Sequence, residues 1–313
     1  MLIDQALADG IRVKAWTFDE LYGRDGKFLD GLDQREQAYV GEVPPNFRLW
    51  TRPPRVTRSG TGSSGKKTLA KPKLVGKRQV GSEVEDLARY SPGLRSQTPQ
   101  RYRVRDSHKG PEIWEVRWHI GYRKTHRARL VSAQCTLIVA TNVRTGERKY
   151  FVSNRVPGRN GWTIRELLRI AFQRWQVEAC FREVKEELGW DHFECRGWIC
   201  VHRHLSITIV AQLFCARVRH RLCPKEDVTA AERLTLEQVR RAADVFIASM
   251  DLPNRLRRKR YEAELERIRY HQRRNAEASR CHRKSRMDDY RAMGIDPDAI
   301  KSVDRKPRAK GKS

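Results

Sequence analysis

The stretch RWQVEACFREVKEELGWDHFECRGW, residues 174–198, places carboxylates and cations among large apolar side chains. Glu178 lies four residues after Arg174 and four before Arg182, and Lys185 follows three residues later. On a helix these spacings make the side chains neighbours along one line. Such a line is either a relay of solvated ion pairs or a place where a carboxylate acts beside cations that bind phosphate.

A second acidic position, Asp19-Glu20, follows the segment IRVKAWTF, which we interpret as a strand that ends near Asp19. A short helix over 27–37 and a strand over 38–44 would complete a parallel crossover. In open sheets of this kind, chemistry gathers at the carboxyl ends of the strands. Carboxylates that converge from a strand end and a helix favour hard divalent cations, and two such ions can serve phosphodiester chemistry.

The elements that must position Glu178 are predicted to be helices. Residues 163–189 have the clearest helical pattern, and Glu178 should lie at the edge of its apolar stripe, between core and surface. That stripe consists of Ile170, Val177, Phe181, Val184 and Leu188. A second apolar helix, about 204–219, should pack against the first. A third over 230–250 has Thr235 as its expected cap.

The middle of the chain is predicted to be rich in strands. In EIWEVRWHIGYR, residues 112–123, apolar side chains alternate with period two, and QCTLIVATN and KYFVSNRV follow with a hairpin-type connection between them. Residues 51–80 differ, because they hold nine Lys or Arg and no acid around SGTGSSGKK, which is typical of a basic loop or linker. We therefore expect a β-rich segment over about 50–158 whose sheet extends the main one.

Composition restricts the classes of partner. The chain has 313 residues, a formal net charge of +27 and 39% hydrophobic residues, so it can bury a core and should attract polyanions. Nucleic acid is the first candidate and an anionic membrane surface the second. The longest apolar run, 205–216, is too short to span a bilayer, and MLIDQALADG does not have the order of a signal peptide.

The seven cysteines are odd in number and scattered, which favours reduced thiols in a cytoplasmic protein. A zinc site at Cys195, Cys200, His202 and His204 is the alternative for one cluster. Because the paired CxxC spacing of strong zinc motifs is missing there, we favour packed thiols.

The spacing of Arg174, Glu178 and Lys185 resembles the signature of bacterial insertion-sequence transposases that use an Asp-Asp-Glu triad. The subgroup is defined by a tyrosine–arginine–glutamate–lysine pattern, and Ala171 stands here at the tyrosine position. KEELGWDHFECRGWICVHRHLSI looks like the continuation found in one part of this family, and LTLEQVRR and YHQRRNAEASRCHRKSR resemble its C-terminal end. The resemblance covers about 11–48 and 112–290.

This resemblance implies an α/β fold: a ribonuclease H-like catalytic core interrupted by a β-rich insertion, with a basic helical C-terminal tail. The corresponding segments are 1–49 (first part of the core), 50–158 (basic loop and insertion), 159–222 (rest of the core) and 223–313 (basic helical region). Asp19 would be the second metal-binding acid and Glu178 the third, with two Mg²⁺ or Mn²⁺ ions. The DNA-binding residues would be Arg174, Arg182, Lys185, Arg196, Arg203 and His204.

The implied activity is metal-dependent cleavage and strand transfer of an insertion sequence in the bacterial nucleoid, by a homo-oligomer bound to transposon ends and target DNA and not to a membrane. The family carries its first acid on an earlier strand, whereas a helix is predicted here over 2–9. We therefore expect an N-terminally shortened transposase that lacks this first aspartate.

Two other classes of function fit parts of the sequence. A non-catalytic DNA-binding remnant or regulator of transposition needs only the basic segments, of which 255–286 carries 13 Lys or Arg against four Glu. An RNA-binding basic protein accounts for the charge but not for the ordered line through Arg174, Glu178 and Lys185, so we rank it lowest.

Overall fold

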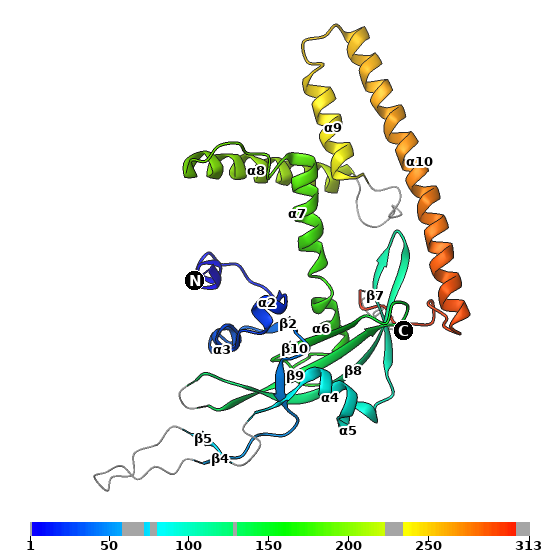
Figure 1. The fold of residues 1–313 in the computed structure, drawn as a ribbon. Helices are drawn as coiled ribbons and strands as arrows, with labels where there is room; N and C mark the ends of the chain where they lie inside the picture. The colour runs from blue at the N-terminus through cyan, green and yellow to red at the C-terminus, as the bar shows by residue number, and fades with distance from the viewer. Residues whose placement is uncertain (1, 58–71, 76–79, 128–129, 223–233, 305–313) are drawn as a thin grey trace, which may run out of the picture. The chain divides into compact units, whose positions relative to one another are not determined.

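The computed structural model describes residues 2–57, 72–75, 80–127, 130–222 and 234–304 (Figure 1). The chain forms two compact units. The first comprises residues 1–105, 112–174 and 296–313, and the second comprises residues 106–111 and 175–295. The predicted four-segment division is a separate matter and stays a prediction.

The first unit is built on one mixed sheet of eight strands, in the order β1-β2-β10-β9-β8-β3-β6, with β7 also paired to β8. Its strands are β1 (Trp16–Phe18), β2 (Tyr39–Val43), β3 (Arg48–Trp50), β6 (Ser82–Glu83), β7 (Gln100–Ser107), β8 (Gly110–Lys124), β9 (Ser132–Asn142) and β10 (Arg148–Ser153). A separate pair, β4 (Val56–Thr57) and β5 (Lys73–Leu74), lies within the predicted basic loop, of which 58–71 and 76–79 are outside the described residues.

The predicted parallel crossover is confirmed. β1 pairs in parallel with β2, and α2 (Glu20–Gly23) and α3 (Gly26–Gln34) connect them. Both helices begin at aspartates, Asp19 and Asp25, whose side chains accept backbone N–H bonds from the first turn. Aspartates in the sequence FDELYGRDG thus set both helix starts. The strand β1 is shorter than predicted: it ends beside Asp19 as expected, but it begins at Trp16 instead of near Ile11.

The long strands β8, β9 and β10 are antiparallel and continue the sheet, as expected for the strand-rich segment. Period-two alternation sorts their side chains between two cores. On one face, α6 (Ile164–Ala171) covers Val40, Trp114, Val116 and Phe151. On the other, α3 and α4 (Val84–Tyr90) cover Tyr39, Leu137 and Val152, and α5 (Pro92–Arg95) adds Leu94. α1 (Leu2–Ala8) precedes β1 in the same unit.

The predicted helix over 163–189 is wrong in one respect, because it is two helices. α6 ends at Ala171 and α7 (Trp175–Leu188) begins after a turn at 172–174. Phe172 packs its ring against Trp114 and Phe151, which fixes the end of α6 on the sheet. The predicted stripe is divided as a result: Ile170 is buried in the first unit, whereas Val177 and Phe181 are exposed on α7.

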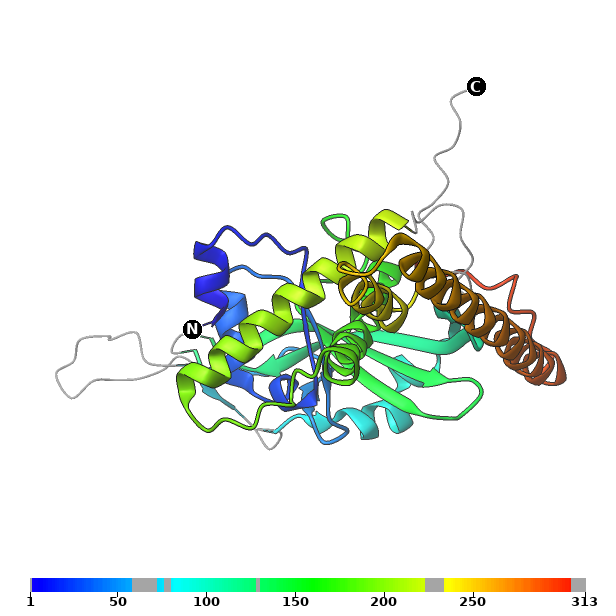
Figure 2. The same ribbon diagram turned by 90° about the horizontal axis from the view of Figure 1, so that it is seen from above.

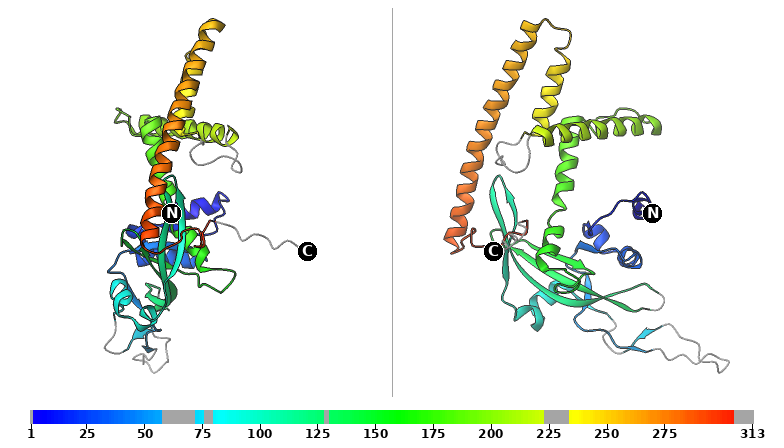
Figure 3. Two further views of the ribbon diagram at one scale, coloured as in Figure 1. Left: turned by 90° about the vertical axis from the view of Figure 1, so that its right-hand side faces the viewer. Right: turned by 180° about the vertical axis from the view of Figure 1, so that it is seen from behind.

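The second unit is helical. Besides α7 it contains α8 (Trp198–Leu222), α9 (Leu236–Ile247) and α10 (Asn254–Ala292), and its small core joins Cys215, Leu236 and Val239. Thr235 caps α9 in a capping box with Gln238, which confirms the predicted cap. α9 and α10 run side by side (Figure 3). After α10, the described residues up to 304 leave the helix: Val303 packs in the α6-side core, and Ser302 forms an isolated β-bridge with Arg103.

The apolar run 205–216 belongs to α8, which is 25 residues long and extends as a single rod in Figure 2. Many of its apolar side chains are exposed, among them Ile207, Val210 and Phe214. In the part of the chain that the structure describes, α8 is the one helix long and apolar enough to cross a membrane by length and composition. Core helices of soluble proteins meet the same criterion, so this feature does not decide the environment of the helix.

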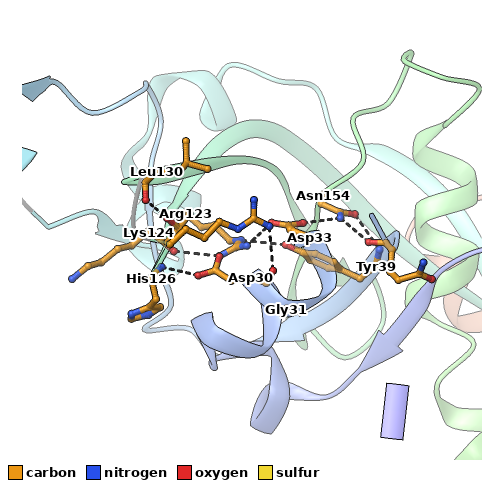
Figure 4. A network of polar contacts seen from close by, with 12 residues as sticks. Asp30, Gly31, Asp33, Tyr39, Arg123, Lys124, His126, Leu130 and Asn154 are labelled. Atoms are coloured by element: carbon orange, nitrogen blue, oxygen red, sulfur yellow. Dashed lines mark hydrogen bonds and ion pairs between the residues drawn. The ribbon is translucent and has the colours of Figure 1, made fainter. Parts of the chain in front are cut away.

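A buried charge network fixes the crossover to the antiparallel strands (Figure 4). Arg123 on β8 is 1% exposed, and its guanidinium lies 2.8 Å from Asp30 Oδ1 and 2.5 Å from Asp33 Oδ2, both on α3. It also donates to Tyr39 Oη at 3.2 Å, while Asn154 donates to Asp33. Burial opposes the charge on Arg123, but Tyr39, Asp33 and Asp30 together raise its pKa, so it stays protonated.

We predict that Arg123→Met destabilises the protein by about 3–5 kcal/mol, because two carboxylates lose their buried cation. Chemical denaturation followed by circular dichroism measures the change. Arg48→Met is the matched control: its pair with Glu83 is exposed, so its cost should stay below about 1 kcal/mol. Equal unfolding midpoints for the two variants would contradict the prediction.

Candidate functional site at the carboxyl ends of the parallel strands

Asp19 lies where the sequence places it, immediately after β1. Its Oδ1 accepts the N–H groups of Leu21 at 3.1 Å and Tyr22 at 3.4 Å and so begins α2. Its Oδ2 makes no hydrogen bond or ion pair with the residues that the structure describes. One oxygen of the carboxylate therefore holds the turn, and the other is available to a cation.

Glu42 on β2 is the neighbour of Asp19 in the sheet. Phe18, the last residue of β1, pairs with Gly41, so Asp19 and Glu42 are the residues that follow this pair. Extension of the strand alternation by one residue would place both on the same face. Close packing confirms the approach of α2 to this strand, because a Cβ added at Gly23 would lie 1.9 Å from the Glu42 carbonyl oxygen. Only glycine fits at that position.

Two cations contact Glu42. Lys149 on β10 places its Nζ 2.9 Å from Glu42 Oε1, and Arg174 places a guanidinium nitrogen 3.9 Å from Glu42 Oε2. Arg174 is the last residue of the first unit and follows the turn that ends α6. The first unit thus gathers two carboxylates and two cations at the carboxyl ends of β1 and β2.

Glu178 lies in the first turn of α7, in the second unit, and is exposed. The prediction that it sits at the edge of a buried stripe is therefore wrong. Arg182 and Lys185 are also exposed on α7, and Lys185 pairs with Asp191 at 3.8 Å. Because Asp19 and Glu178 belong to different compact units, their joint grip on metal ions stays a prediction.

The remaining predicted DNA-binding residues are all in the second unit. Arg196 is exposed in the segment between α7 and α8, and Arg203 is exposed on α8. His204 is half-buried, and its Nε2 lies 2.8 Å from the Gly189 carbonyl oxygen. Since a carbonyl only accepts, this nitrogen carries a proton and the ring holds the chain where α7 ends. The contact of these three residues with DNA stays a prediction.

Over the described residues, no group of three or more His, Cys, Asp or Glu side chains comes close enough to hold a metal ion. The donor chemistry at Asp19 nevertheless suits Mg²⁺, which takes one or two protein carboxylates and fills its other positions with water and substrate phosphate. Sequence analysis did not single out Glu42 or Lys149. A signal for Glu42 was present in the sequence: it is the acid of the predicted strand AYVGEVP, which follows the strand that ends at Asp19 in the predicted parallel crossover.

Comparison with sequence families matches residues 1–111 to the family described as DDE superfamily endonuclease. The matched segment includes Asp19 and Glu42 and ends before Glu178. The match covers 111 of the 313 residues and supports a DDE transposase or endonuclease family. Endonuclease activity on DNA and the use of divalent metals are general properties of that superfamily. The mixed α/β fold is consistent with such a nuclease. No curated protein matches the chain.

The two roles of Asp19 can be separated by substitution. Asp19→Asn keeps a good helix cap and removes the charge, so we predict nearly unchanged stability. Asp19→Ala removes the cap as well and should cost about 0.5–2 kcal/mol in denaturant unfolding. If the two variants lose the same stability, the capping role of the Oδ1 contacts is contradicted.

Proposed function

We propose that the protein is a DNA transposase of the insertion-sequence type, which cleaves phosphodiesters at element ends and transfers the released strand. One observation carries the proposal. Arg174 contacts the carboxyl end of β2 beside Asp19, and Glu178 lies in the first turn of the helix that starts at the next residue, Trp175. Chain connectivity therefore limits how far Glu178 can be from the strand end, at about 1.5 Å per helical residue.

In the proposed mechanism, Asp19 and Glu178 hold the divalent ions from a strand end and from a helix. Two ions held there would supply activation of an attacking oxygen and stabilisation of the leaving oxygen of a phosphodiester. Asp19 uses Oδ2, because Oδ1 is engaged in capping α2. Arg174 and Lys185 hold the DNA backbone, and water and then a 3′-hydroxyl attack in line. The ribonuclease H-like core and the residue that supplies a further acid are part of this proposal.

The second unit provides surfaces for DNA along α10. Arg269, Arg273 and Arg280 are exposed on α10 at successive spacings of four and seven residues, and so point to a similar side of the helix. Exposed arginines at such spacing fit the phosphates of a DNA strand, and each contact releases counterions. This surface would hold DNA whether or not cleavage follows.

Iron-directed cleavage of the protein tests the shared metal site. Fe²⁺ with ascorbate produces radicals that cut a polypeptide near the bound ion, so a shared site predicts cuts close to both Asp19 and Glu178. Asp19→Asn or Glu178→Gln should abolish both sets of cuts. Cuts near one residue alone, or cuts that persist near Asp19 in the Glu178→Gln variant, would refute the shared site.

Cleavage of DNA containing element ends, with Mg²⁺ or Mn²⁺, tests the activity. Glu178→Gln should reduce it at least about 100-fold, as expected when a group that stabilises the transition state is lost. Glu186→Gln is the matched control, since it removes an equally exposed acid from the same helix and should leave activity unchanged. Equal rates for Glu178→Gln and the unsubstituted chain would end the assignment of Glu178.

The salt dependence of DNA affinity tests the surface of α10. Replacing Arg269, Arg273 and Arg280 together by glutamine should reduce the slope of log affinity against log salt by up to about 0.9 per arginine. The corresponding triple lysine variant keeps the charge and should keep the slope. An unchanged slope in the glutamine variant would exclude this surface from phosphate contact.

A non-catalytic DNA-binding protein is the second candidate, either a remnant of a transposase or a regulator that competes for element ends. The exposed cations of α10 favour it, because they need no metal site to bind DNA. Salt-dependent binding without iron-directed cuts near Asp19 and Glu178, and without metal-dependent cleavage, would identify this alternative.

A further inference from the structure

Three charged groups from distant parts of the sequence meet on one face of the sheet. Glu42 pairs with Phe151 across β2 and β10, and Lys149, two residues before Phe151, shares its face. This is the face that α6 covers, since Phe151 and Val40 belong to its core. Figure 1 shows β2 beside β10 with α6 close by. Arg174 reaches Glu42 from the turn that follows α6.

Glu42 is more deeply buried than the two cations that contact it. The side chain of Glu42 is 12% exposed, whereas those of Lys149 and Arg174 are 27% and 29% exposed. The carboxylate thus lies beneath the two cations, and the cations reach solvent. A second acid, Glu147, lies 3.8 Å from Lys149 but is 54% exposed, so solvent screens it. The two cationic groups are thus more accessible to solvent than the carboxylate that they share.

The cations also lie beside the carboxylate that is expected to hold metal. Asp19 follows Phe18, and Glu42 follows Gly41, the residue that pairs with Phe18 where β1 ends. Its Oδ2 is available to a cation, as described above. A phosphate next to a metal-binding carboxylate requires positive groups that hold its other oxygens. Lys149 and Arg174 are positioned to provide such groups.

We propose that Lys149 and Arg174, oriented by Glu42, form a binding site for one phosphate of the DNA backbone at the carboxyl ends of β1 and β2. The inference rests on the proposed function for its ligand and adds Lys149 and Glu42 to the residues that contact or position DNA. Lys149 acts as a point charge, and Arg174 offers a planar fork to two phosphate oxygens. Glu42 is a positioning residue, because it acts through the two cations.

The alternative role for the cluster is mechanical: an ion pair that only joins β2, β10 and the end of α6. A mechanical pair changes thermal stability when it is removed but does not change how DNA affinity responds to salt. A phosphate site changes both the affinity and the salt slope. The two roles are therefore separable by one titration series.

The experiment measures binding of a fluorescein-labelled DNA duplex by the full chain in EDTA, over a KCl series. Lys149→Gln should reduce the magnitude of the salt slope by about 0.9 and weaken binding about eightfold at about 0.1 M salt. Arg148→Gln is the matched control, since it removes an exposed cation from the adjacent position, on the opposite face of the same strand, and should change neither quantity. Lys149→Arg keeps the charge and should keep the slope.

The role of Glu42 is measured with a double-mutant cycle. If Glu42 orients Lys149, then Lys149→Gln should weaken binding at most half as strongly, in logarithmic units, when Glu42→Gln is already present. Glu147→Gln, which removes the exposed acid near the same lysine, should leave the Lys149→Gln effect unchanged. Additive effects of Glu42→Gln and Lys149→Gln would overturn the positioning role.

An unchanged slope in Lys149→Gln, together with a lower melting temperature, would overturn the phosphate site and identify a mechanical pair. That outcome leaves the proposed function intact as long as iron-directed cuts appear near both Asp19 and Glu178. If the unsubstituted chain binds duplex DNA without salt dependence, both the phosphate site and the proposed function are refuted.

Discussion

The buried guanidinium of Arg123 is the interaction on which the arrangement of the first unit depends. It joins α3, through Asp30 and Asp33, to the longest strand of the antiparallel part of the sheet. α3 is one of the two helices that connect the parallel strands β1 and β2, so the crossover that begins at Asp19 and leads into β2 is held against the sheet. A guanidinium buried as deeply as that of Arg123 is tolerated only where several hydrogen-bond acceptors surround it. Because the acceptors come from fixed positions on α3 and β2, they define how these elements lie against β8.

Local chemistry explains the parts of the fold that the sequence could predict. The helix caps are local, since the aspartates before α2 and α3 and Thr235 before α9 bond to backbone N–H groups two or three residues away. The burial pattern of β8 is local as well, because it follows from the alternation of its side chains. The position of Asp19 at a strand end follows from the same local signals. The parallel pairing of β1 and β2 follows from element order alone.

Contacts between distant residues explain what the sequence could not predict. The helical pattern continues through 172–174, yet Phe172 packs against Trp114 and Phe151 and ends α6 there. Glu42 meets Lys149 only because β10, which follows more than a hundred residues later, pairs with β2. Neither contact produces a repeating pattern in the sequence, so neither could be predicted before the tertiary structure was known.

The turn at 172–174 also has a consequence for the signature that first suggested chemistry. Its arginine, Arg174, is bound to the sheet through Glu42, whereas its glutamate and lysine belong to a separate helical body. The motif therefore crosses the boundary between the two compact units, and the turn that ends α6 leads directly into the helix that carries its glutamate.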